Sequence, residues 1–197
     1  HVQNALRAAN QAECDVSLGE AVGALERTTQ LAEQLLTFSR LASGTDMQLQ
    51  REVSLADVCR DVMALQEPLL DRRGQSLGLS ATHDCSVQGD PYRLQQLLRN
   101  LIENASRHGL ARGDIDVAID CSDGQCLLRV SNDGDPVPDE ETENVFRPYY
   151  RLRPGGKSGA GLGLSIVRQI ADQHGATVMI ARKADAQGCV VTVAFPR

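Results

Sequence analysis

Asn100 and Asn104 are the side chains in this sequence best suited to hold a metal-bound phosphate. They are four positions apart, so they share one face of a helix expected at Pro91–His108. Leu97 and Leu101 belong to the buried face of that helix, and two amides beside it need hydrogen-bond partners. Amide oxygens suit a hard cation such as Mg²⁺, which also keeps phosphate oxygens in its shell. A pair of structural amides is the alternative.

Basic side chains follow the asparagine pair. Arg107 and His108 come one turn later and add donors for phosphate. A second group of cations follows a long turn-rich stretch, in a chain whose net charge is −6. We interpret this group as neutralising phosphate, although an ordinary solvated run of charges has the same composition. Its members are Arg147, Arg151, Arg153 and Lys157.

A glycine-rich segment, residues 156–164, directly precedes another expected helix. Its glycines allow close approach to a phosphate, and N–H groups at a helix start bind anions. The segment contains a GxGxxG spelling, but no strand precedes it as a dinucleotide site requires. A further turn, Val130–Pro138, follows an expected strand and by itself is typical of any surface turn. The glycine-rich segment and the turn each indicate a phosphate site only through their order in the chain relative to the asparagines.

Composition excludes several classes of protein. The sequence pI of about 5.2 argues against a surface that binds duplex nucleic acid. No apolar run approaches the roughly 20 residues that span a bilayer. The six cysteines form no CxxC pair and no cluster with the sequence spacing of zinc ligands, so we expect thiols in a reducing cytoplasm. The chain begins inside a helical pattern without Met, which suggests a piece of something longer.

The elements that must position these residues fall into two expected domains, 1–45 and 46–197. Residues 1–43 are predicted to form a helical hairpin whose apolar seam alternates in steps of four and three. So wide a stripe predicts a four-helix bundle made from two chains, with packing against its own chain as the alternative. Ser43–Asp46 breaks the second helix and is the expected boundary.

The second domain is predicted to be an α+β two-layer sandwich, with three helices on one mixed, mostly antiparallel sheet. Ser54 and Asp90 are expected to cap the first two helices, and Gly175 to end the third. The expected helices are 54–73, 91–108 and 161–174. The expected strands are 47–53, 76–81, 85–88, 115–121, 126–130, 177–182 and 189–195, with 132–159 irregular.

These stretches, in this order, resemble the N, G1 and G2 boxes of the ATP-binding domain of sensor histidine kinases, within the gyrase-like ATPase superfamily. Phe146–Arg151 resembles the F box of that domain, and Gln34–Leu41 resembles the end of its second dimerisation helix. The similarity covers nearly the whole chain. It implies a protein that binds Mg·ATP and passes the γ-phosphoryl group to a His, for relay to an Asp of a response regulator in two-component signalling.

The resemblance also implies roles for individual residues. Asn100 and Asn104 would hold Mg²⁺ and the phosphates, and Arg107 would reach the phosphate chain; these three form the implied catalytic group. Residues 146–159 would be a lid over ATP. The residues implied to contact ATP are Asn100, Asn104, Arg107, His108, Asn132, Asp133, Gly134, Arg151, Lys157, Gly159, Gly161, Leu162, Gly163 and Leu164.

The G1 turn departs from the family pattern. Asn132 stands where the family usually has the Asp that accepts the adenine amino hydrogen, and Pro136 replaces a usual Gly. An amide oxygen still serves adenine, and Asp133 in a shifted turn is the alternative. A nucleotide-binding or dimerisation module with degenerate catalysis therefore stays open beside the kinase.

Phosphoryl transfer is favoured over hydrolysis. Gyrase-type ATPases carry Glu four residues before the metal-binding Asn, and Asn100 in that place cannot act as a base. Glu103 lies about 100° round the helix from Asn104 and is expected to point away from the line of attack. A serine-kinase reading within the same superfamily stays open, although the hairpin argues against it.

The family's acceptor string, a His followed by an acidic residue, is absent. The residues after His1 do not match it, so we expect the acceptor upstream and a fragment unable to autophosphorylate. The implied partners are a second copy through the hairpin and the receiver domain of a response regulator. No binding to nucleic acid and no direct contact with a membrane are expected. The resemblance implies that the chain is the cytoplasmic portion of a bacterial sensor anchored in the inner membrane.

Overall fold

The computed structural model describes residues 51–82, 85–122, 124–152, 160–184 and 187–196, together with Leu18, Thr28 and Ala32. The remainder of the expected hairpin and the boundary at 43–46 lie outside the described residues. So do two residues implied to contact ATP, Lys157 and Gly159. Among the described residues, no helix is long and apolar enough to cross a bilayer.

Five strands form the main sheet, in the order β2-β4-β5-β7-β6. β2 pairs with β4 in parallel, and every other pair is antiparallel. A separate two-stranded sheet joins β1 to β3. The strands are β1 Arg51–Ser54, β2 Ser76–Ala81, β3 Ser86–Gly89, β4 Asp114–Ser122, β5 Gln125–Asn132, β6 Thr177–Arg182 and β7 Cys189–Pro196.

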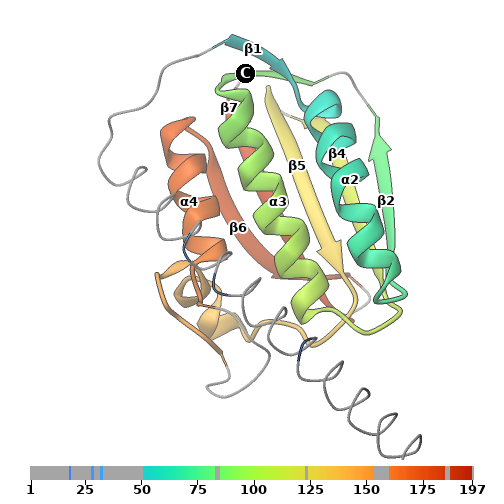
Figure 1. Cartoon of the computed structure of the whole chain (residues 1–197). Helices are drawn as coiled ribbons and strands as arrows, with labels where there is room; N and C mark the ends of the chain where they lie inside the picture. The colour runs from blue at the N-terminus through green and yellow to red at the C-terminus, as the bar shows by residue number, and fades with distance from the viewer. Residues whose placement is uncertain are drawn as a thin grey trace, which may run out of the picture.

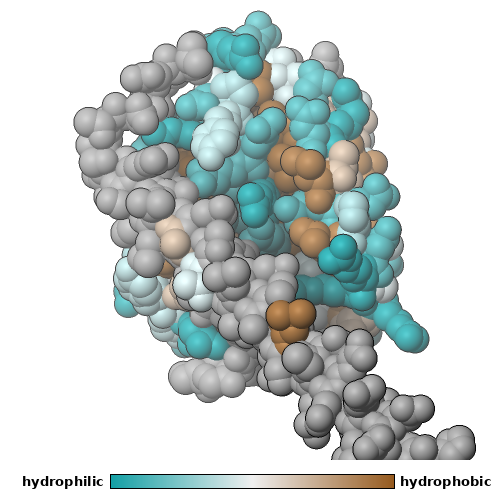
Figure 2. Space-filling view, viewed as in Figure 1, coloured by the Kyte–Doolittle hydropathy of each residue, from teal (hydrophilic) through white to brown (hydrophobic). Residues whose placement is uncertain are grey.

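Three helices cover one face of the main sheet (Figure 1). They are α2 Leu55–Asp71, α3 Pro91–His108 and α4 Gly163–Gln173, with α3 in the middle. This arrangement confirms the predicted α+β two-layer sandwich with a mixed, mostly antiparallel sheet. Figure 2 shows that the outer surface of the helical layer is mainly hydrophilic, as expected of amphipathic helices that bury their apolar stripe on a sheet.

The core between helices and sheet is aliphatic. Along β5 every second side chain is buried, which matches the period of two of a strand with one face on the core. On α3 the side chains of Leu94, Leu97, Leu98 and Leu101 are at most 1% exposed. Because this apolar stripe fixes the rotation of α3, the helix face that carries Asn100 and Asn104 is fixed as well.

The helix ends follow the predicted capping residues. Ser54 Oγ accepts the Asp57 N–H at 3.3 Å, and Asp90 Oδ1 accepts the Tyr92 N–H at 2.9 Å. Gly175 ends the last helix with φ of +63°. That helix begins at Gly163, two residues later than predicted, because Gly161 before it has φ of +71°. The irregular stretch also contains two short 3₁₀ turns, η1 Asp139–Glu141 and η2 Asn144–Phe146.

The expectation of thiols is wrong for two cysteines. Cys85 and Cys121 form a disulfide across 36 residues of sequence. Cys85 directly precedes β3 and Cys121 lies near the end of β4, so the fold brings together two residues that no local spacing rule connects. Cys59, Cys126 and Cys189 are buried and outside that disulfide.

Candidate functional site

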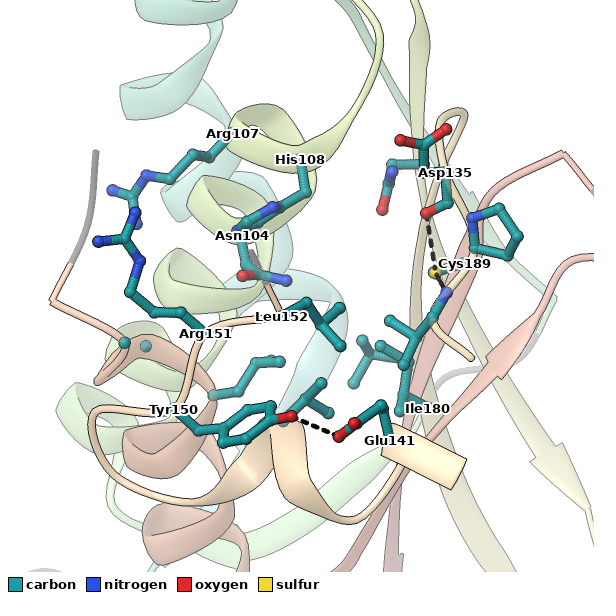
Figure 3. Close-up of a pocket in the computed structure, with 18 of the residues that line it drawn as sticks. Asn104, Arg107, His108, Asp135, Glu141, Tyr150, Arg151, Leu152, Ile180 and Cys189 are labelled. Carbon is teal, nitrogen blue, oxygen red and sulfur yellow. Dashed lines mark hydrogen bonds between the residues drawn. The ribbon is translucent and has the colours of Figure 1, made fainter. Parts of the chain in front are cut away.

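A cavity of about 520 Å³ lies between the C-terminal half of α3, the G1 turn and the start of α4 (Figure 3). This volume is typical of a site for a small organic ligand. The residues that line the cavity lie far apart in the sequence, from Asn100 to Val191. Of the residues implied to contact ATP, the structure places nine in its wall: Asn100, Asn104, Arg107, His108, Asn132, Arg151, Gly161, Gly163 and Leu164.

The amide of Asn100 has a defined orientation. The side chain is 8% exposed, and its Nδ2 donates to the Gln96 carbonyl one turn earlier at 2.8 Å. Its Oδ1 therefore faces away from the helix backbone, toward the start of α4, where a Cβ added to Gly163 would lie 3.6 Å from it. Asn104 follows one turn later and also lines the cavity (Figure 3). This face of α3 thus offers amide oxygen to whatever the cavity binds.

Cationic side chains lie at one edge of the cavity. Arg107 from α3 and Arg151 from the segment after η2 both contribute to it, and Figure 3 shows both at that edge. Burial is the main cause that lowers the pKa of Arg107; Glu103 opposes that shift and nearby Arg73 adds to it. Like charges that converge on one edge favour an anion between them.

The G1 turn separates its two candidate adenine ligands. Asn132 is 8% exposed and lines the cavity, and its Nδ2 donates to the Asp133 carbonyl at 3.2 Å. Because this bond uses the nitrogen side of the amide, the side-chain oxygen of Asn132 points away from the Asp133 carbonyl. Asp133 lies outside the cavity wall, and its Oδ1 accepts from Lys183 Nζ at 2.5 Å. Of the two, only Asn132 is placed to contact a bound ligand.

The Lys183 bond also has an electrostatic consequence. It is the main cause that lowers the pKa of Asp133, with a smaller contribution from the Asp114 N–H. A carboxyl with a lowered pKa stabilises the fold above its unfolded pKa, and this contribution is lost as the pH falls through the lowered value. The pair therefore holds the G1 turn to β6 at neutral pH.

Two glycines allow the G1 turn to pack closely. Gly134 has φ of +153°, and a Cβ there would lie 2.9 Å from the His108 carbonyl oxygen. Gly188 has φ of +121°, and a Cβ there would lie only 1.9 Å from the Asn132 carbonyl oxygen. Gly134 and Leu162, both implied to contact ATP, are not in the cavity wall. The close approach of Gly188 to Asn132 is a tertiary contact that no local pattern in the sequence predicts.

An apolar wall completes the cavity opposite the arginines. Ile180 from β6 and Val191 from β7 face it, with Pro136 and Val137 beside them. Cys189 Sγ accepts the Val137 N–H at 3.2 Å, and burial raises the pKa of its thiol. Ile180 and Val191 were missed because an apolar residue on an alternating strand looks like any other core residue.

Hydrogen bonds and one cation–π contact fix the segment from η1 to Tyr150, which precedes the glycine-rich stretch. Tyr150 Oη donates to Glu141 Oε2 at 2.5 Å, and the Tyr149 N–H donates to the Gly161 carbonyl at 2.9 Å. Phe146 is buried, and the Arg168 guanidinium of α4 lies 4.4 Å from its ring centroid. The described base of the expected lid is thus fixed to α4.

That Glu103 points away from the line of attack stays a prediction. Glu103 contributes to the cavity wall. Its carboxylate accepts from Arg99 Nε at 2.8 Å, one turn earlier on the same helix. This ion pair draws the carboxylate toward Arg99.

A sequence model of the family described as "Histidine kinase-, DNA gyrase B-, and HSP90-like ATPase" matches residues 89–197. Sensor protein CutS of Streptomyces coelicolor is 34% identical over 176 residues, covering 87% of this chain and 41% of that protein. Sensor protein QseC of Salmonella typhi is 36% identical over 176 residues, covering 87% of this chain and 37% of that protein. The chain thus spans about two-fifths of the length of these relatives.

Solved structures show the same fold. The catalytic domain of histidine kinase ThkA superposes with a TM-score of 0.66 at 27% identity, covering 76% of this chain and 97% of that one. The cytoplasmic segment of histidine kinase QseC superposes with a TM-score of 0.60 at 25% identity, covering 86% of this chain and 93% of that one.

Two glycine substitutions test the packing at the start of α4. We expect Gly161→Ala to lower the free energy of unfolding by about 1–3 kcal/mol, because of its positive φ and because the new Cβ would lie 2.7 Å from the Tyr150 carbonyl oxygen. Gly163→Ala is the matched control, since its Cβ meets only an ordinary contact. Urea unfolding measures both. Equal stability of the two variants contradicts the packing described.

Proposed function

Since the chain belongs to the histidine kinase-, DNA gyrase B- and HSP90-like ATPase family, as part of a sensor histidine kinase, we propose that it binds Mg·ATP and donates the γ-phosphoryl group to a histidine. The acceptor would lie on a dimerisation helix, and the phosphoryl group would pass on to an Asp of a response regulator. We assign residues 46–197 to the catalytic domain and 1–45 to the dimerisation hairpin.

One observation carries this proposal: the two walls of the cavity differ in chemistry. Amide oxygens and the guanidinium of Arg107 lie on the α3 side, facing the N-terminal end of α4 at Gly163. Backbone N–H groups at a helix start favour phosphate. The opposite wall, with Ile180 and Val191, is apolar and suits a purine ring. A triphosphate and a base therefore have separate places in one cavity.

The donor set fits Mg²⁺. A hard divalent cation takes oxygen ligands, and the Asn100 oxygen is directed into the cavity because its amide nitrogen is bonded to Gln96. We assign Asn100 and Asn104 as its protein ligands. When bound, Mg²⁺ would offset negative charge on the phosphate oxygens. Arg107 would bind and orient the phosphate chain beside it, together with Arg151 at the same edge of the cavity.

Adenine would be selected by Asn132. Its Nδ2 donates to Asp133, so its oxygen remains for the amino group of the base. Guanine presents a carbonyl at that position, and two oxygens would face each other. Gly134 and Gly188 support this role because they allow the turn to lie close against α3 and β7. His108 lies at the rim of the same cavity and would flank the nucleotide.

Transfer rather than hydrolysis is supported by the groups near the phosphates. An amide at Asn100 cannot take a proton from water, and the carboxylate of Glu103 is paired with Arg99. The protein's part is then to position ATP and neutralise charge for an incoming nucleophile. A dimer through the hairpin, a response regulator as receiver and a cytoplasmic position in a membrane-anchored sensor are proposed from the family resemblance alone.

Calorimetric titration with a non-hydrolysable ATP analogue tests the binding step. We expect Asn104→Ala to weaken Mg²⁺-dependent binding at least about tenfold, a loss of about 1.4 kcal/mol, because a ligand of the metal is removed. Gln95→Ala is the matched control, since that amide lies on the same helix and contacts Asp61 instead. Wild-type affinity in Asn104→Ala, or binding that ignores Mg²⁺, contradicts the assignment.

Competition between ATP and GTP tests Asn132. We expect wild-type protein to prefer ATP, and Asn132→Asp to retain that preference, because both side chains offer an oxygen to the adenine amino group. Asn132→Leu should lose the preference, since it offers none. If GTP competes as well as ATP against wild-type protein, the adenine role of Asn132 is refuted.

A phosphotransfer assay separates the kinase from a degenerate module. The protein is incubated with γ-labelled ATP and a separately prepared dimerisation hairpin of a relative, with its acceptor His or with that His replaced by Gln. The kinase reading predicts label on the first hairpin only. ATP binding without any label on either hairpin favours the module, for which the departures at Asn132 and Pro136 are the supporting observations.

A further inference from the structure

Three cysteines gather at the end of the sheet opposite the nucleotide cavity. Cys85 directly precedes β3, Cys121 is near the end of β4, and Cys126 is near the start of β5. Cys121 and Cys126 are register partners on neighbouring strands, and the three sulfur atoms lie within 4.8 Å of one another. From Cys126 to Asn132, β5 spans roughly 20 Å, so this cluster is separate from the cavity.

The spacing of the sulfur atoms suits a shared metal ion. The Sγ atoms of Cys121 and Cys126 are 3.9 Å apart. Two sulfurs that bind one tetrahedral ion at the usual zinc–sulfur distance of about 2.3 Å are about 3.8 Å apart. Cys85 is bonded to Cys121, and breaking that bond would leave a third sulfur within reach of the same ion.

The surroundings suit a soft ion rather than a hard one. The three candidate ligands are all sulfur, and thiolates select d¹⁰ ions such as Zn²⁺ and Cu⁺. Cys85 and Cys126 are fully buried, whereas Cys121 is half-buried. An ion from solvent would reach the cluster at Cys121. Because the ligands come from three chain segments already fixed by sheet pairing, little chain entropy would be lost on binding.

We propose that Cys85, Cys121 and Cys126 form a binding site for one thiophilic d¹⁰ ion, Zn²⁺ or Cu⁺, which is available only when the Cys85–Cys121 disulfide is reduced. Two equivalents of a small thiol reduce that bond, yielding the reductant's own disulfide and two cysteine thiols. Binding then forms three metal–sulfur bonds and releases the three thiol protons. The disulfide and the metal complex are thus alternative states of one cluster.

The place of the cluster beside β1 means that a bound ion would link separate parts of the fold. The Cys85 carbonyl accepts the Leu55 N–H at 2.9 Å, at the junction of β1 and α2, and Ser54 pairs with Ser86. An ion bound by the three cysteines would therefore tie β4 and β5 to the point where β1 enters the domain. This inference does not depend on the proposed kinase activity.

Anaerobic zinc and copper(I) titrations against a chromophoric chelator test the proposal on the whole chain. We expect reduced wild-type protein to bind one ion, and oxidised wild-type protein and reduced Cys126→Ser to bind it more than about tenfold more weakly. Cys59→Ser is the matched control, because Cys59 is buried on α2 outside the cluster. Equal affinity of reduced wild-type protein and Cys126→Ser overturns the proposal.

Proton release gives an independent readout. Calorimetry of the reduced protein in buffers of different ionisation enthalpy should detect about three protons released per ion, because a thiol gives up its proton when it binds a metal as a thiolate. Binding without proton release would mean attachment to surface carboxylates and would refute the site. Should Cys126→Ser not fold, as judged by circular dichroism, Cys121→Ser replaces it, since that half-buried position tolerates a polar side chain better.

Discussion

The hydrogen bond from Asn100 Nδ2 to the Gln96 carbonyl is the constraint on which the candidate site depends. It occupies the donor side of the amide within its own helix, so that the acceptor side must face the cavity. The bond is effective only because α3 cannot rotate: its leucine stripe is buried on the sheet and between two other helices. Core packing and site chemistry are therefore coupled through a single helix, whose apolar face sets the direction of its polar one.

The G1 turn is held by close backbone contacts and by one ion pair. Gly188 lets β7 begin directly against the carbonyl of Asn132, and Gly134 lets the same turn rest on the end of α3. The Asp133–Lys183 ion pair holds the turn from outside. The turn that carries Asn132 is thus fixed by two close backbone contacts and one ion pair.

Local physics made much of the fold predictable from sequence. Asp90 followed by Pro91 marked the start of α3, and the alternation from Cys126 to Val130 marked β5. The four-residue spacing of Asn100 and Asn104 likewise predicted one shared face. In contrast, the apolar wall at Ile180 and Val191 could not be separated from ordinary core.

Contacts between segments far apart in the sequence could not be predicted, because no local pattern encodes them. Gly188 meets Asn132, and Cys85 meets Cys121, only after strands far apart in sequence have paired. Spacing rules for cysteine ligands count residues along the chain, whereas the sheet brings Cys85, Cys121 and Cys126 together across it. The resulting cluster and the candidate site occupy opposite ends of β5.

The most direct test of the central claim is a crystal structure with an ATP analogue and Mn²⁺ in place of Mg²⁺, with anomalous diffraction used to locate the metal. The account predicts one anomalous peak at coordination distance from the Asn100 and Asn104 side-chain oxygens and from the phosphates, with the base against Ile180 and Val191. A metal bound away from both asparagines, or a nucleotide outside the cavity, would contradict it.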